Sequence, residues 1–165
     1  MAHHRTPPER VFVALGTNLG DRLLNLEEAI RRVALLDEVT LVSRGTVLDT
    51  AALLPGADAL PQPRYLNTVI ELASHRTPRS LLEALLAIEH GMGRVRSERW
   101  GPRVIDLDLV LFGERIIDEA GLQLPHPGLA SRRFVLEPLV ALAGSLRHPV
   151  IGRPLRELLE ALAPC

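Results

Sequence analysis

The sequence predicts a single α+β domain with the element order βαββαβ, in which two helices pack on one face of a sheet. Two observations predict this. Four apolar runs have the length and composition of strands, and two segments between them repeat apolar residues at helical spacing. The 165 residues suffice to bury a substantial core, and no Gly- or Ser-rich linker divides them. We place one domain at residues 10–165, after a disordered lead-in at residues 1–9.

The first half of the chain supplies three strands and one helix. Residues 10–15 form an apolar run that is typical of a buried strand. Asp21 can cap a helix over residues 22–35, in which apolar side chains recur on one face. Residues 39–48 and 65–73 are rich in β-branched and other apolar residues, and they are the predicted second and third strands.

The second half supplies a helix, a strand and several additions. The helix begins at Thr77 and Pro78, where a capping hydroxyl precedes the proline that fits the first helical position. Residues 104–112 form the fourth strand. A short hairpin and two short helices, near 133–143 and 155–162, are expected after it. The predicted architecture is a ferredoxin-like core with C-terminal additions.

Two connections in this architecture are unusually long. Residues 49–64 join the second and third strands, and residues 93–103 join the second helix to the fourth strand. The first has 16 residues, and structureless connections beyond about 12–15 residues are mostly functional or disordered. The second is shorter but holds four arginines. We expect both to be catalytic loops that act as lids over a site.

Charge and composition exclude several classes of protein. A formal net charge of −1 gives no bulk attraction to nucleic acid or to an anionic membrane. No apolar run approaches the roughly 20 residues of a membrane-spanning helix, and residues 1–8 lack the apolar segment of a secretory signal. The single cysteine, Cys165, cannot form a disulfide within the chain. We expect a cytoplasmic protein.

Two acidic residues in the fourth strand are the strongest local signal. Asp106 and Asp108 are two positions apart, so a strand places both carboxylates on one face. Two carboxylates repel each other unless a cation lies between them, and Mg²⁺ prefers such oxygen ligands together with phosphate and water. The alternative is a solvent-facing strand with acidic outer positions. The residues expected to face the core are Ile105, Leu107, Leu109 and Leu111.

An arginine-rich segment precedes this strand. Its members are Arg94, Arg96, Arg99 and Arg103, and the only tryptophan of the chain, Trp100, lies among them. All 19 basic residues of the chain are arginines, so phosphate would be held by guanidinium groups. Cations beside Mg²⁺-binding carboxylates suit a polyphosphate, and Trp100 can stack on a flat ring. The alternatives are a solvated surface loop and a core tryptophan.

Other polar residues form weaker signals. His126 lies between prolines and shortly before Arg132, which makes it a candidate for a phosphate or adenine contact. Asn67 offers both a donor and an acceptor to the edge of a heterocycle. Residues 16–21 are Gly-rich but match no phosphate-binding motif, so we interpret them as a tight turn, with Asn18 as a candidate ligand.

Four blocks of the sequence carry a resemblance to a known family. They are LGTNLGDR at 15–22, YLN at 65–67, GRVRSERWGPRVIDLDLVLFG at 93–113 and the PH…RxF arrangement at 125–134. Together they resemble the 6-hydroxymethyl-7,8-dihydropterin pyrophosphokinases of the folate pathway. The resemblance implies that pyrophosphate passes from ATP to the hydroxymethyl group of the pterin and that AMP leaves. It also implies that two Mg²⁺ ions bridge the ATP phosphates.

The resemblance assigns a role to each candidate residue. The residues implied in catalysis are Arg94, Arg96, Asp106 and Asp108, of which the two aspartates bind the metal. The residues implied in ATP binding are Arg96, Trp100, Arg103, Leu109, His126 and Arg132. The residues implied in pterin binding are Thr50, Leu53, Tyr65, Asn67 and Phe134. The chain departs from the family after Thr50, where a proline typically follows soon and this chain has Ala51 and Ala52. It also departs at Pro127, where some members have Tyr, and at Gly121, where some have a basic residue.

Two other function classes compete with this one. A ferredoxin-like core also occurs in nucleotide- and RNA-binding modules, but those are usually basic and stack bases on aromatic residues, which make up only 3% of this chain. A metal-dependent phosphodiesterase could use the aspartate pair but usually has further His or carboxylate ligands. We expect ATP and the pterin as partners, and no nucleic acid, membrane or obligate protein partner.

Overall fold

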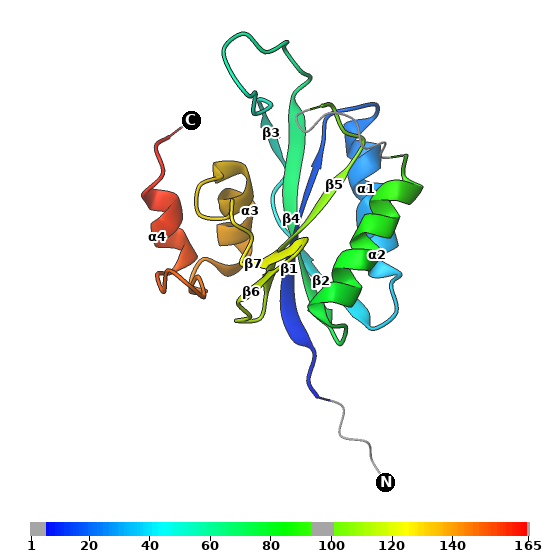
Figure 1. The fold of residues 1–165 in the computed structure, drawn as a ribbon, viewed down its shortest axis with the longest axis vertical. Helices are drawn as coiled ribbons and strands as arrows, with labels where there is room; N and C mark the ends of the chain where they lie inside the picture. The colour runs from blue at the N-terminus through cyan, green and yellow to red at the C-terminus, as the bar shows by residue number, and fades with distance from the viewer. Residues whose placement is uncertain (1–5, 94–100, 165) are drawn as a thin grey trace.

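The computed structural model describes residues 6–93 and 101–164 (Figure 1). The helices and strands in chain order are β1 (Glu9–Thr17), α1 (Arg22–Ala34), β2 (Val39–Arg44), β3 (Leu48–Thr50), β4 (Tyr65–Ser74), α2 (Pro78–Gly91), β5 (Asp106–Phe112), β6 (Ile117–Glu119), β7 (Leu122–Leu124), α3 (Arg133–Ala143) and α4 (Leu155–Glu160). The predicted βαββαβ order is confirmed, and the predicted hairpin is β6 with β7. No helix in these ranges is long and apolar enough to cross a membrane.

The main sheet is antiparallel and has the strand order β2-β4-β1-β5, with β3 also paired to β4. The predicted second strand is in fact two strands, because the chain breaks after Arg44. At the break, the Gly45 N–H donates to the Val69 carbonyl at 2.7 Å. A Cβ on Gly45 would lie 2.9 Å from that oxygen and 3.0 Å from the carbonyl oxygen of Pro138 in α3. The chain passes so tightly between β4 and α3 that only glycine fits.

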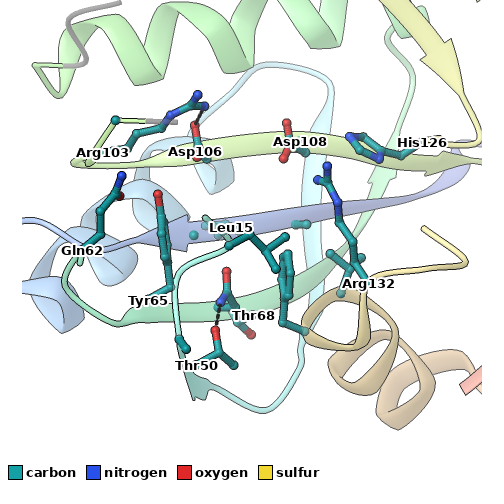
Figure 2. Close-up of a pocket in the computed structure, with 18 residues that line it drawn as sticks. Leu15, Thr50, Gln62, Tyr65, Thr68, Arg103, Asp106, Asp108, His126 and Arg132 are labelled. Atoms are coloured by element: carbon teal, nitrogen blue, oxygen red, sulfur yellow. Dashed lines mark hydrogen bonds and ion pairs between the residues drawn. The ribbon is translucent and has the colours of Figure 1, made fainter. Parts of the chain in front are cut away.

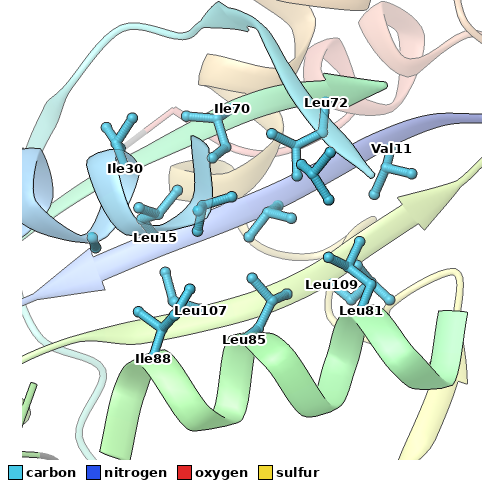
Figure 3. Close-up of a cluster of buried hydrophobic side chains, with 14 of the residues drawn as sticks. Val11, Leu15, Ile30, Ile70, Leu72, Leu81, Leu85, Ile88, Leu107 and Leu109 are labelled. Atoms are coloured by element: carbon cyan, nitrogen blue, oxygen red, sulfur yellow. The ribbon is translucent and has the colours of Figure 1, made fainter. Parts of the chain in front are cut away.

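The sheet is covered on both faces, in three layers (Figure 1). Helices α1 and α2 pack on one face over a continuous apolar cluster (Figure 3). Helices α3 and α4 pack on the other face over a second cluster. The sequence predicted two helices on one face, and the C-terminal helices add the third layer.

The predicted helix starts are confirmed by their caps. The Asp21 carboxylate accepts the N–H of Leu24 at 3.0 Å, at the start of α1. The Thr77 hydroxyl accepts the N–H of Ser80 at 3.2 Å, and Pro78 occupies the first turn of α2. At the N-terminal end, β1 already begins at Glu9, one residue earlier than the expected domain start, and the Glu9 carboxylate binds Arg115.

Strand β5 departs from the predicted alternation at its far end. Ile105, Leu107 and Leu109 lie in the cluster under α1 and α2, as expected. The prediction for Leu111 was wrong, since its side chain lies in the opposite cluster, with Val110. The cause is a register shift against β1, in which Val13 pairs with Leu109 but Phe12 pairs with Leu111. Such a bulge turns the following side chain to the other face.

Candidate active site

A pocket of about 330 Å³ opens on the α3 face of the sheet, at the end where β4 and β5 begin (Figure 2). Strands β1, β4 and β5 form its floor, and α3 and the connection between β3 and β4 form its walls. The lining residues are Ala14, Leu15, Gly16, Thr50, Ala51, Leu53, Gln62, Tyr65, Asn67, Thr68, Gly101, Arg103, Asp106, Asp108, His126, Arg132, Phe134 and Val135.

The two aspartates of β5 lie on one wall of this pocket, as the alternation predicted. Across the strand pair, Asp106 is opposite Gly16 and Asp108 is opposite Ala14. Because these partners on β1 have no side chain or only a methyl group, the floor between β5 and β4 stays open. Asp108 is exposed and Asp106 is half-buried, so both carboxylates are accessible to a ligand in the pocket.

Arg103 partly balances this negative charge. Its Nη1 donates to the Asp106 carboxylate at 2.9 Å. Burial acts to lower the pKa of Arg103, but the hydrogen bond to Asp106 and the negative charges around it outweigh burial, so the pKa is raised above its usual value. The Arg103 guanidinium therefore stays charged beside the two carboxylates. Since it offsets only one of their two negative charges, a bound cation is compatible with this pocket.

His126 and Arg132 approach the carboxylates from the other side (Figure 2). The His126 Nδ1 accepts the N–H of Gly128 at 2.9 Å, which leaves the proton of the neutral ring on Nε2. Burial lowers the pKa of His126, the Asp108 carboxylate opposes this shift, and the Arg132 guanidinium adds to it. The ring is therefore a neutral hydrogen-bond donor at neutral pH. A Cβ on Gly128 would lie 2.6 Å from the Arg132 Nε, so this glycine makes room for the Arg132 side chain.

The wall opposite the carboxylates is polar and aromatic. The Asn67 Nδ2 donates to the Thr50 hydroxyl at 2.8 Å and thereby joins β4 to the end of β3. Tyr65 pairs with Thr50 across the same two strands, and Phe134 enters from the start of α3. Leu53, from the long connection, completes the set of five residues predicted to bind the pterin, all of which line the pocket.

Asn18 connects two loops beside the pocket through hydrogen bonds. Its side chain is only 2% exposed. The Oδ1 atom accepts the N–H of Arg103 at 2.7 Å, and Nδ2 donates to the Pro63 carbonyl at 3.1 Å and to Gln62 at 3.4 Å. These bonds join the ends of the two long connections, so the interpretation of Asn18 as a ligand was wrong. The interpretation of Gly16 as part of a turn was also wrong, because it lies within β1.

Comparisons with known proteins identify the family. Residues 12–144 match the family described as 7,8-dihydro-6-hydroxymethylpterin-pyrophosphokinase (HPPK). A 2-amino-4-hydroxy-6-hydroxymethyldihydropteridine pyrophosphokinase of Pseudomonas aeruginosa is 45% identical over 153 residues, which cover 93% of this chain and 91% of that protein. The chain belongs to the HPPK family.

Further HPPK relatives support the membership. A protein of the same name from Synechocystis is 39% identical over 148 residues, which cover 90% of this chain and 73% of that one. A crystal structure of a Plasmodium falciparum HPPK-DHPS triple mutant superposes with a TM-score of 0.73 over 96% of this chain, at 14% sequence identity. This chain spans 45% of that longer protein, and the likeness concerns the fold.

A second hollow, of about 680 Å³, adjoins the first pocket. It lies between α2 and the β6–β7 hairpin, and Asp108 and His126 line both spaces. Leu109, which the HPPK resemblance assigned to ATP binding, lies on this second hollow and not on the first pocket. Its side chain is buried in the core under α2, so it offers the hollow only a small apolar surface.

The donor set fits a metal that completes its coordination with substrate oxygens. Among residues 6–93 and 101–164, no group of three or more His, Cys, Asp or Glu side chains could hold an ion. Asp106 and Asp108 alone provide two carboxylates on one pocket wall. Mg²⁺ commonly takes one or two carboxylates together with phosphate oxygens and water. The residues present therefore fit Mg²⁺ that arrives with a nucleotide.

Two groups of residues complete the comparison with the HPPK prediction. Arg94, Arg96 and Trp100 lie outside the described residues. Conversely, the sequence analysis did not assign Gly16 and Gln62 to the pocket, although both line it. Gly16 lies between Asn67 on β4 and Asp106 on β5, and only the paired strands reveal this position.

Proposed function

We propose that the protein transfers pyrophosphate from ATP to the hydroxymethyl group of 6-hydroxymethyl-7,8-dihydropterin. The products are AMP and the pterin diphosphate, and the reaction belongs to tetrahydrofolate biosynthesis. The observation that carries this proposal is that the carboxylates of Asp106 and Asp108 share one pocket with an amide and aromatic wall. One side of the pocket suits a metal-bound polyphosphate, and the other suits a flat heterocycle.

The pterin end is the part of the pocket around Asn67. Asn67, Gly16 and Asp106 lie in one row across β4, β1 and β5. A ring in this row would meet the amide at one edge and carry its hydroxymethyl group toward Asp106. Tyr65 and Phe134 supply the apolar surfaces that a flat ring needs.

The nucleotide end extends from the carboxylates into the second hollow. Asp108 and His126 line both spaces, so a triphosphate beside them connects the pterin pocket with the hollow. We assign the nucleoside of ATP to this hollow, with Leu109 on its wall. Arg132 and the Nε2–H of His126 then donate to phosphate oxygens.

Different residues of the pocket are assigned to metal binding, charge neutralisation and proton acceptance. We assign two Mg²⁺ ions to the carboxylates of Asp106 and Asp108, where bound Mg²⁺ would withdraw negative charge from the phosphate oxygens. Arg103 and Arg132 neutralise charge on either side, and the pterin hydroxyl is held toward the β-phosphorus. Proximity and charge stabilisation provide most of the acceleration in such a transfer. Asp106 lies in the same row as Asn67, so it is the group that we assign to accept the hydroxyl proton.

Further assignments rest on the sequence. We propose that Arg94 and Arg96 contribute to catalysis and that Arg96 and Trp100 contact ATP. We also propose that residues 10–165 act as one domain and that the reaction takes place in the cytoplasm. The family membership and the four matching sequence blocks support these assignments.

The direct test is a product analysis. The protein is incubated with ATP and Mg²⁺, with and without 6-hydroxymethyl-7,8-dihydropterin, and nucleotides and pterins are separated by chromatography. We expect AMP and pterin diphosphate in equal amounts, and no AMP when either the pterin or Mg²⁺ is left out. Formation of ADP, or of AMP without the pterin, would contradict the proposed reaction.

A further inference from the structure

One buried acidic side chain lies on the wall of the second hollow. Glu89 lies in the last turn of α2, and its side chain is 2% exposed. Within residues 6–93 and 101–164, it is the only acidic residue that is buried. Burying a carboxylate is costly, and the C-terminal end of a helix is an unfavourable place for a negative charge. A residue at such a position needs a specific contact to account for it.

One such contact is with the main chain of β5. A carboxylate oxygen of Glu89 accepts the N–H of Leu107 at 2.7 Å. Strand β5 is at the edge of the main sheet, with β1 on its other side, so no further strand in the described part of the chain receives this N–H. Glu89 therefore takes the place of a neighbouring strand at this one position.

Leu107 lies between the two aspartates of the pocket. Its side chain packs under α2 in the core, while Asp106 and Asp108 project to the opposite face. The bond from Leu107 to Glu89 fixes the orientation of the peptide that joins Asp106 to Leu107. Because successive strand side chains point to opposite faces, this orientation determines how the two carboxylates lie relative to each other.

We propose that Glu89 is a positioning residue, which holds β5 so that Asp106 and Asp108 present their carboxylates to the same divalent cation. The inference rests on the proposed function, because it assumes that the two aspartates bind a metal. Groups that orient metal ligands typically change metal affinity by about 10–100-fold when they are removed. The hydrogen bond to the Leu107 N–H is the contact to which we assign the effect.

Two conservative substitutions separate the hydrogen bond from the charge. Glu89→Gln retains an acceptor oxygen at the same reach and loses the charge. Glu89→Asp retains the charge but is one methylene shorter, so it does not reach the Leu107 N–H. Leu81→Ala is the matched control, because Leu81 is also buried on α2 but lies two helical turns away from Glu89.

The measurement is Mn²⁺ binding by electron paramagnetic resonance, in the presence of a non-hydrolysable ATP analogue and without the pterin. We expect Glu89→Asp to bind Mn²⁺ about 10–100-fold more weakly than the parent, and Glu89→Gln to bind within about threefold of it. Leu81→Ala should be less stable but bind Mn²⁺ as the parent does. In turnover, Glu89→Asp should need more Mg²⁺, with an unchanged KM for the pterin. Its affinity for the nucleotide analogue without metal should equal that of the parent; a loss there would overturn the positioning role, because Glu89 also lines the nucleotide hollow.

The outcomes distinguish this inference from the proposed function. If the parent binds Mn²⁺ but Glu89→Asp binds it equally well, the positioning role is overturned and the proposed function stands. If Glu89→Gln binds Mn²⁺ as weakly as Glu89→Asp does, the hydrogen bond to Leu107 does not position the carboxylates and the inference is again overturned. If the parent itself does not bind Mn²⁺ with the nucleotide analogue, both proposals fail together.

Discussion

The two faces of the sheet differ in how completely they are covered. Under α1 and α2, apolar side chains form a continuous cluster along the strands (Figure 3). On the other face, α3 and α4 cover a second cluster, but the end where β4 and β5 begin is left open as the pocket (Figure 2). The same strands therefore serve stability on one face and chemistry on the other.

Neighbouring positions on β5 illustrate this division most closely. Leu107 is buried under α2, whereas Asp108, the next residue, is exposed in the pocket. Strand alternation alone separates the two roles, because adjacent side chains point to opposite faces. Substitutions on the two faces should therefore change either activity or stability, and rarely both.

The largest effect is expected for Asp108→Asn, which removes a charged group from the pocket face. We expect kcat to fall by at least about 100-fold, the size of the loss when one group that stabilises charge is removed from a preorganised site. The free energy of unfolding should be unchanged or slightly higher, because a repulsion with Asp106 is relieved. Steady-state kinetics and chemical denaturation measure the two quantities. A kcat within a few-fold of the parent would mean that Asp108 does not bind the metal.

The matching change on the covered face is Leu72→Ala. Leu72 is fully buried near the end of β4 that is far from Tyr65. We expect the free energy of unfolding to fall by about 2–5 kcal/mol, through lost burial and the cavity that remains. Below the unfolding transition, kcat should stay close to the parent value. A loss of kcat as large as that of Asp108→Asn would break the proposed separation of the two faces.

A smaller effect is expected for Gly16→Ala, at the floor of the pocket. A Cβ at this position would lie 2.8 Å from the Asn67 Oδ1 and 3.6 Å from the Tyr65 Cδ1. Displacing these side chains should raise the KM for the pterin about tenfold, since overpacking costs about 1–3 kcal/mol. The KM for ATP should change much less, and an equal rise in both constants would show that Gly16 does not belong to the pterin end.

The smallest effect concerns acid stability at His148, in the turn between α3 and α4. Its Nδ1 accepts the N–H groups of Val150 and Ile151 at 3.2 and 3.1 Å, and burial lowers the pKa of His148 below its usual 6.5. The unfolded chain therefore takes up this proton first, so the stabilisation is present above about pH 6.5 and is lost as the pH falls below it.

In His148→Gln, the free energy of unfolding should decrease less than in the parent between about pH 7.5 and 5.5. The quantity to compare is how steeply the free energy of unfolding changes with pH, and not its absolute value, because His148→Gln also changes the hydrogen bonds at this position. His126 shifts in the same direction but is present in both proteins, so it cancels. Parallel pH profiles of unfolding for the parent and the variant would contradict the assignment to His148.

Local patterns in the sequence were sufficient to predict the features that depend on neighbouring residues. The caps at Asp21 and Thr77 follow from residue type and position, and both are formed. The common face of Asp106 and Asp108 follows from a spacing of two in a strand, and both line the pocket. The match to the four sequence blocks then led to the correct family.

Features that depend on distant segments could not be predicted in this way. The break after Arg44 arises from the close approach of α3 to Gly45, and the turned side chain of Leu111 arises from a register shift against β1. The pocket position of Gly16 requires the pairing of β1 with both β4 and β5. The contact of Glu89 with Leu107 joins residues on a helix and a strand across the second long connection.

The most direct test is a crystal structure of the protein with Mg²⁺, the pterin and a non-hydrolysable ATP analogue. The account predicts Mg²⁺ bound to oxygens of both Asp106 and Asp108 at about 2.0–2.1 Å, with phosphate oxygens completing the octahedron. The pterin ring should lie between Asn67 and Phe134, with its hydroxymethyl group toward the β-phosphorus. A complex in which the nucleotide is bound but neither carboxylate contacts a metal ion would contradict the account.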